Sequence, residues 1–148
     1  MPFRFPLQAV LRLRESFERR ERQRLEAITR ELVKAQQQRE QAKLARANSL
    51  VQLQKKLQQG ITAAEMQFEL ASDRARVRQI ASSNDRVSML EDLRRRQLEV
   101  FRKAQQQRKI LENLRDRQLA AYRLVQSRRE QQRTDDRYLI AQARERAS

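Results

Sequence analysis

The side chains best able to do chemistry in this sequence are carboxylates that lie next to each other. Glu91 is followed by Asp92, and Asp135 by Asp136. Two neighbouring carboxyl groups can act as a general acid and a general base, but only in a cleft that holds the substrate and excludes water. Both pairs lie in stretches that read as exposed helix, where carboxylates are normally solvated. We therefore expect surface groups here and no catalytic pair.

The residue types that are missing exclude most other reactions. The 148 residues include no histidine and no cysteine, and the one glycine is Gly60. The chain therefore has no imidazole base, no thiolate nucleophile and no ordinary zinc ligands. A single glycine also cannot build a phosphate-binding loop or a nucleophile elbow. We expect a non-enzymatic protein that binds or acts mechanically, with no catalytic residues, no cofactor and no metal.

The elements that position all other side chains are helices. Ala, Glu, Lys, Leu and Arg make up more than half of the sequence, and the two prolines, Pro2 and Pro6, lie at the N-terminus. This composition is typical of coiled coils. With 36% charged and 5% aromatic residues, the chain cannot fill a thick core, but it can fill the seam between two helices. Full disorder is the alternative, and the helical spacing of the apolar residues argues against it.

The sequence predicts one sharp turn, at Gly60. Glycine adopts the left-handed conformation that ends a helix without a steric penalty. Thr62 and Glu65 directly after it have the spacing of a capping box, which starts a new helix. We therefore expect a single all-α coiled-coil domain over residues 1–148, folded as a long antiparallel hairpin. Its parts are helix 1 at about 6–58, a turn at 59–62 and helix 2 at about 63–145.

Helix 1 carries a clear apolar seam with heptad spacing. An adjacent stripe of Val10, Leu13 and Phe17 makes the apolar face of the first turns wider than two helices require. Charged residues interrupt the seam. The seam consists of Leu7, Leu11, Leu25, Ile28, Leu32, Ala35, Ala42 and Leu53. The interruptions are Arg14, Glu18, Glu21, Arg39 and Arg46.

Helix 2 is harder to assign. Its first part offers two stripes, one with Ile61, Ala64, Phe68, Ala71 and Ala75 and a second with Met66, Leu70 and Val77. Both stripes lapse at 81–85, where serine, asparagine and aspartate favour helix caps. A break at 82–85 and a continuous helix remain alternatives. From residue 90 we predict a seam of Leu90, Leu93, Val100, Ala104, Leu111, Leu114, Ala121, Val125 and Leu139.

The two helices have unequal lengths. Pairing about Gly60 places Leu32 near Leu90 and Leu7 near Leu114, and it places Leu53 beside Phe68. Helix 1 then ends, and the roughly 30 residues after Gln118 overhang as a single helix of about 45 Å. Arginines on this overhang would attract an acidic partner.

The formal net charge of +15 indicates an anionic partner or a solvated helix face. The basic residues are spread along the chain without aromatic residues between them, so we expect no specific nucleic-acid readout. An acidic protein fits better than nucleic acid or anionic membrane, which stay as alternatives. No apolar run approaches the roughly 18 residues that span a bilayer, and we expect a cytosolic protein.

Two stretches of the sequence resemble the flagellar export protein family FliJ. The first is the opening FRFPLQAVLRLRE, from Phe3 to Glu15. The second runs from Leu111 through Tyr122 to Glu130 and Gln131, with Asp135 and Asp136 following. A basic chain of about 150 residues with a turn near Gly60 also fits the plan of the family. An injectisome protein of the same kind is the nearest alternative.

The resemblance implies a stalk similar to the gamma subunit of rotary ATPases, which enters the hexameric ring of the export ATPase. It also implies contact with the cytoplasmic domain of the export gate and with export chaperones, at the cytoplasmic face of the inner membrane. The implied ring-binding residues are Phe3, Phe5, Leu7, Val10, Leu11, Tyr122, Val125, Glu130, Gln131, Asp135, Tyr138 and Ile140. The implied gate-binding residues are Met66, Phe68, Leu70, Val77 and Ile80.

Overall fold

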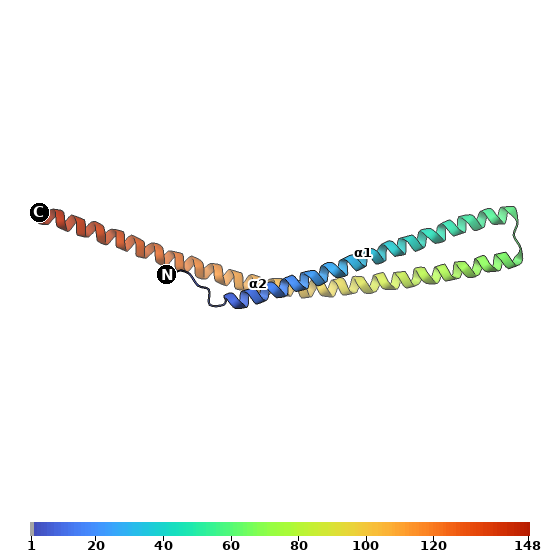
Figure 1. Ribbon diagram of the computed structural model, residues 1–148, viewed down its shortest axis with the longest axis horizontal. Coiled ribbons are helices and arrows are strands. Elements are labelled where there is room, and N and C mark those ends of the chain that lie inside the picture. Colours follow the sequence, from blue (N-terminus) through green and yellow to red (C-terminus); the bar gives the residue numbers. More distant parts are fainter. Residues whose placement is uncertain (1) are drawn as a thin grey trace. The chain divides into compact units, whose positions relative to one another are not determined.

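The protein consists of two long helices joined by a tight turn (Figure 1). The computed structural model describes residues 2–148, and no strand occurs among them. Helix α1 spans Gln8–Gln59, 52 residues, and α2 spans Ala63–Ala147, 85 residues. The two helices pack against each other, which confirms the predicted all-α hairpin.

The chain divides into two compact units, which we describe separately. The central unit is Arg19–Arg102 and contains the turn. The terminal unit combines Met1–Glu18 with Lys103–Ser148. The single coiled-coil domain expected over residues 1–148 stays a prediction.

The turn has the local chemistry expected from the sequence. Gly60 has a φ of 87°, and its amide donates to the carbonyl of Leu57 at 3.3 Å. The Thr62 hydroxyl accepts the Glu65 amide at 3.2 Å, as in a capping box. Gly60 is the only residue with positive φ in the described chain 2–148, so the one glycine stands at the one position that needs it.

The ends of the helices differ slightly from the prediction. Helix α1 begins at Gln8, two residues after Pro6, because residues 6 and 7 form a turn in which the Gln8 amide donates to the Phe5 carbonyl at 3.1 Å. Helix α2 shows no break at 82–85. Ser83 is half-buried between the helices and Val87 is buried one turn later, so packing against α1 holds the polar stretch helical.

A heptad pattern of buried and half-buried residues describes the seam of each helix, unbroken in α1 and interrupted in α2 at the exposed Arg94. In α1 it includes every charged residue that seemed to interrupt the apolar seam. These seam positions are Leu11, Arg14, Glu18, Glu21, Leu25, Ile28, Leu32, Ala35, Arg39, Ala42, Arg46, Ser49 and Leu53. Leu7, which was assigned to the seam, is 39% exposed.

In α2 the predicted seam was half wrong. Leu90, Ala104 and Leu111 face α1, but Leu93, Val100, Val125 and Leu139 are exposed. The first stripe after the turn is also wrong, since Phe68 is 70% exposed and does not pair with Leu53 in the seam. The observed positions are Met66, Glu69, Asp73, Arg76, Ile80, Ser83, Val87, Leu90, Gln97, Phe101, Ala104, Arg108, Leu111, Arg115, Gln118 and Tyr122.

Apolar packing in the central unit is concentrated in one cluster. It contains Leu32 and Ala35 of α1 with Val87 and Leu90 of α2. The pairing of Leu32 with Leu90 agrees with the predicted register. Each Leu-sized side chain buried in this way contributes roughly 1.5 to 3 kcal/mol, so the cluster is the main apolar anchor of this unit.

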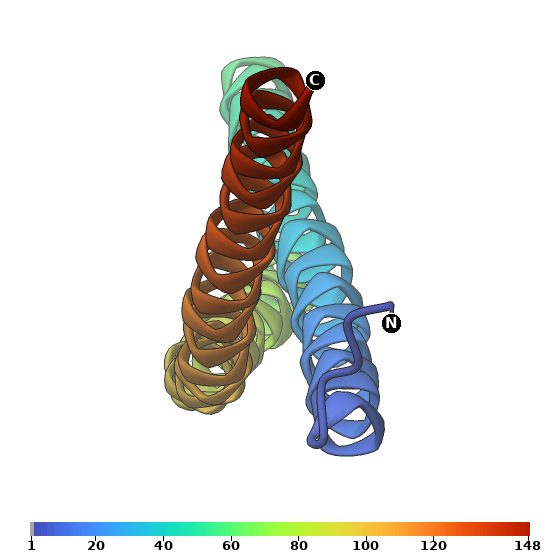
Figure 2. The same ribbon diagram turned by 90° about the vertical axis from the view of Figure 1, so that its left-hand side faces the viewer.

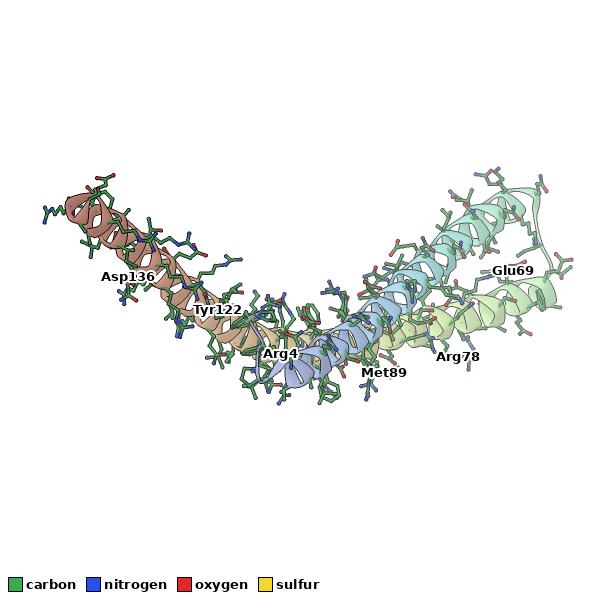
Figure 3. The ribbon with its side chains drawn as sticks, turned by 60° about the vertical axis from the view of Figure 1, so that its left-hand side comes forward. Arg4, Glu69, Arg78, Met89, Tyr122 and Asp136 are labelled. Carbon is green, nitrogen blue, oxygen red and sulfur yellow. The ribbon has the colours of Figure 1, made fainter. Side chains whose placement is uncertain are left out.

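Between this cluster and the turn, charged pairs occupy the seam. Arg46 Nε donates to Asp73 Oδ1 at 2.9 Å, and Lys56 Nζ donates to Glu69 Oε1 at 2.9 Å. Glu69 lies on the α2 arm next to the turn (Figure 3). On the other side of the cluster, Gln97 Nε2 donates to Glu21 Oε2 at 2.5 Å. Polar contacts therefore connect the helices at these three places beside the apolar cluster.

The Arg46–Asp73 contact makes the stability of the protein depend on pH. The hydrogen bond from Arg46 holds the pKa of the Asp73 carboxyl below its usual range. Its contribution to folding is complete above the unfolded-state value of about 3.9, and it is lost as the pH falls through the lower folded-state value. We expect Asp73→Asn to lower the free energy of unfolding at neutral pH and to have much less effect once the pH falls below the lowered folded-state pKa of Asp73.

Urea unfolding followed by circular dichroism at several pH values measures this difference. Asp85→Asn is the matched control, because Asp85 is an exposed aspartate of α2. Within residues 2–148 it forms no hydrogen bond or ion pair with α1. An Asp73→Asn effect that stays constant down to about pH 2 would show that the carboxylate does not stabilise the hairpin through its charge.

Candidate protein interface

The N-terminal lead-in packs on α2 beyond the start of α1. Phe5 is 7% exposed, and the ring of Phe3 lies 5.6 Å from the ring of Tyr122 with an interplanar angle of 48°. Leu119 and Arg115 of α2 line the same shallow hollow as Phe3 and Phe5. Figure 1 shows this short segment running past the start of α1, and Figure 2 shows it leading from the N-terminus into α1. The lead-in therefore extends the packed part of the terminal unit to Tyr122.

In the first turns of α1, after the lead-in, an apolar contact and an ionic network hold α1 and α2 together. Leu11 is fully buried. Glu18 is 4% exposed and accepts a hydrogen bond from Arg108 Nε. Arg108 Nη1 also donates to Glu112 Oε2 at 2.5 Å. Desolvation lowers the pKa of Arg108, but the hydrogen bonds to Glu112 and Glu18 outweigh it and raise the pKa above the ordinary arginine value. The arginine is a permanent cation in this seam.

The last part of α2 has no chain segment beside it. Tyr122 is half-buried, but residues 127–141 are all exposed while remaining helical. Asp136 lies on this bare segment, and Tyr122 lies on α2 between Asp136 and the lead-in residue Arg4 (Figure 3). The predicted overhang therefore starts a few residues later than expected, because the lead-in covers Leu119 and Tyr122.

The structure separates the implied ring-binding residues into two groups. Phe5 and Leu11 are buried inside the terminal unit, and Phe3 and Tyr122 are half-buried against each other. These four residues position the lead-in and α1, and they are not free to bind a partner as they stand. The residues with exposed side chains are Leu7, Val10, Val125, Glu130, Gln131, Asp135, Tyr138 and Ile140.

The implied gate-binding residues also divide by burial. Met66 and Ile80 are half-buried at seam positions of the central unit. Leu70 and Val77 are 42% and 43% exposed, and their spacing of seven residues places them on one face of α2. Phe68 is exposed on another face. The exposed pair Leu70 and Val77 is the part of this set that a partner can reach.

Sequence reasoning missed the role of Glu18 and Arg108. Glu18 was an interruption of the seam, and Arg108 was assigned no contact. The signal that could have found them is spacing, because Glu18 and Arg108 fall seven residues after Leu11 and Phe101, which are apolar seam positions. Continuing the heptad through charged residues would have placed both of them in the seam.

No side-chain cluster in residues 2–148 resembles a metal site, and neither helix in that part of the chain is long and apolar enough to cross a membrane. Of the paired carboxylates, Asp135 and Asp136 are exposed on the bare part of α2. Glu91 lines a shallow open hollow with Leu32, Gln36, Arg94, Arg95 and Leu98. The terminal unit has a bare helix with exposed apolar and basic side chains, and it has separate exposed apolar residues on α1.

Comparisons with known proteins give one match. The sequence model of the family described as Flagellar FliJ protein matches residues 3–147, nearly the whole chain. Searches of curated proteins and of solved structures found no match.

The ionic network predicts a measurable coupling between Glu18 and Arg108. Replacing Arg108 by leucine removes the cation that hydrogen-bonds a buried carboxylate, and we expect a loss of roughly 3 kcal/mol in the free energy of unfolding. The double variant Glu18→Leu with Arg108→Leu should regain most of this loss, since two apolar side chains can pack in the seam. Arg117→Leu, at an exposed position of α2, is the control and should change stability little.

A double-mutant cycle in urea measures the coupling. Additive effects of the two single substitutions would contradict the network as a stabilising contact.

Proposed function

Since this chain belongs to the FliJ family of flagellar proteins, we propose that it is a non-enzymatic stalk that binds the export ATPase ring and the export gate. Membership in the family makes it a component of the flagellar export apparatus. The contacts with the ring and the gate are our proposal. We also propose that the protein works at the cytoplasmic face of the inner membrane, held there by the apparatus.

The single observation that supports the stalk is the bare part of α2. Residues 127–141 form a regular helix that packs on no other part of the described chain, and Tyr138, Leu139 and Ile140 are each more than half exposed. An isolated helix gains little stability without packing of an apolar face. A partner that encloses this segment would supply the missing packing, as the lining of a ring does for an inserted stalk.

The charges of this segment fit an acidic rim. Arg123, Arg128, Arg129, Arg133 and Arg137 all project from exposed positions. Complementary charge at the mouth of the partner would speed association and orient the helix, while the apolar residues provide most of the affinity. Binding that depends on Tyr138 and Ile140 therefore separates this function from non-specific attraction to nucleic acid, which depends on charge and salt.

Hydrogen exchange with and without the cognate export ATPase tests the ring contact. We expect amides of residues 122–141 to exchange fast in the free protein and to become protected in the complex. The double variant Tyr138→Ala with Ile140→Ala should weaken ATPase binding by about tenfold or more. Phe68→Ala is the control, because Phe68 is equally exposed but lies in the central unit.

Unchanged exchange at 122–141, or full ATPase binding after truncation at Gln118, would contradict the stalk. Binding of duplex DNA or anionic vesicles that persists near physiological salt, with no effect of the Tyr138 and Ile140 changes on ATPase binding, would favour the alternative of a general anion-binding coiled coil.

The proposed gate contact falls on the exposed face of α2 that carries Leu70 and Val77. We expect Leu70→Ala with Val77→Ala to weaken binding to the purified cytoplasmic domain of the export gate by about tenfold. Leu44→Ala, at an exposed leucine of α1 in the same unit, should leave binding unchanged. Equal binding by all variants, measured by titration calorimetry, would remove this face from the gate contact.

A further inference from the structure

The terminal unit has an apolar flank that neither the hairpin seam nor the bare helix accounts for. In α1 it consists of Val10, Leu13 and Phe17, which are 40%, 51% and 39% exposed. In α2 it consists of Ile110, which is 65% exposed, and the half-buried Leu114. We call these five residues the apolar flank. None of them occupies a seam position.

A hydrogen bond places the two rows on the same side of the helix pair. Arg14 Nη1 donates to Gln107 Oε1 at 2.6 Å. Arg14 lies between Val10 and Phe17 along α1, at helical spacings of four and three residues. Gln107 precedes Ile110 by three residues and Leu114 by seven, so it shares their face of α2. The contact between Arg14 and Gln107 therefore lies among the members of the flank.

The opposite side of the terminal unit is different. The positions directly after the seam residues carry Glu15, Gln105 and Glu112, and the lead-in covers Leu119. A two-helix coiled coil needs apolar residues only at the seam, whereas a helix with two partners has a wider apolar stripe that includes one flanking position. The apolar residues are therefore concentrated on one side of the helix pair. This is typical of helices that pack against a third helix on that side.

The charges around the apolar flank identify the kind of helix that fits. Lys103 and Arg117 stand seven residues before and after Ile110, in line with it on α2. Arg14 lies within the flank, and Arg128 follows on the row of Leu114. Between residues 103 and 128 these rows of α2 carry no aspartate or glutamate, and Asp135 follows Arg128 by seven residues. A helix with basic neighbours would be repelled, and one bordered by carboxylates would be attracted.

We propose that the apolar flank is a docking site for a third helix from another protein, an amphipathic helix whose apolar stripe is bordered by aspartate and glutamate. The helix packs on Val10, Leu13, Phe17, Ile110 and Leu114. Its carboxylates face Lys103 and Arg117. The site shares Val10 with the proposed ring surface, and its test therefore uses no ring protein.

The probe is a designed, fluorescently labelled peptide of about four heptads, with leucine and isoleucine in its apolar stripe and glutamate on both borders. A second peptide has the same stripe with lysine borders. Fluorescence anisotropy with the full chain measures the dissociation constants. We expect the glutamate peptide to bind with a micromolar or lower constant, and the lysine peptide to bind at least tenfold more weakly.

Two double variants locate the site. Phe17→Ala with Ile110→Ala changes only exposed side chains of the flank, so the hairpin should fold normally, as circular dichroism will show. We expect it to weaken binding of the glutamate peptide about tenfold or more. Leu44→Ala with Phe68→Ala, at exposed apolar positions of the central unit, should leave binding unchanged.

Several outcomes would overturn the proposal. These are no binding of the glutamate peptide below about 1 mM, equal binding of both peptides, or equal losses in the two double variants.

A dimer in sedimentation experiments that the flank variant abolishes would assign the site to a second copy of the chain. Flank-dependent binding to phosphatidylglycerol vesicles would assign it to a membrane. If the chain does not bind the ATPase in the exchange experiment but still binds the glutamate peptide, the proposed ring contact is wrong and the proposed docking site is unaffected.

Discussion

In each compact unit the structure depends on the register between α1 and α2, and that register is held largely by charged and polar contacts in the seam. Only six apolar side chains of the described chain are buried, among them Leu11, Leu32 and Leu90. Between Leu11 and Leu32 stand Glu18 with Arg108 and Glu21 with Gln97. Arg46 pairs with Asp73 between the cluster and the turn. Polar partners in a seam add modest net stability, because desolvation offsets much of the attraction. They do penalise every shifted register, since a shift leaves charges without their partners.

The same feature explains which parts of the fold the sequence could predict. The fold class, the turn at Gly60 and the seam of α1 followed from composition, glycine chemistry and the spacing of apolar residues. The seam of α2 could not be predicted in this way, because the polar residues Arg108, Arg115 and Gln118 occupy seam positions. The apolar residues Leu93 and Val100 lie outside the seam. A seam assigned from the apolar residues alone therefore falls on the neighbouring apolar face of α2 and misses the face that contacts α1. Heptad continuity from the turn was the better guide.

The candidate interface was predictable in location but not in composition. Unequal helix lengths alone indicated that α2 extends past α1, and the structure places residues 127–141 there without a packed neighbour. The sequence could not show that Phe3 and Phe5 fold onto α2, since an extended segment before a proline has no periodicity to read. The lead-in removes Phe5 from the candidate surface, and it pairs Phe3 with Tyr122. Burial therefore leaves fewer surface residues than the family resemblance implied.

The distribution of packing along the terminal unit has a mechanical consequence. Leu11, Phe5 and the network of Glu18 and Arg108 hold α1 and α2 together, and the helix continues beyond this clamp with no internal partner. A force applied to the bare end of α2 reaches the clamp first, because helical hydrogen bonds make the intervening segment a stiff rod. A clamp made of permanent charges keeps its partners over the neutral pH range, since arginine stays protonated there. A purely apolar seam would also resist separation, but it would allow the helices to slide past each other by a heptad. The buried ion pair opposes that sliding, so a helix used as a lever transmits its motion to the other helix in one fixed register.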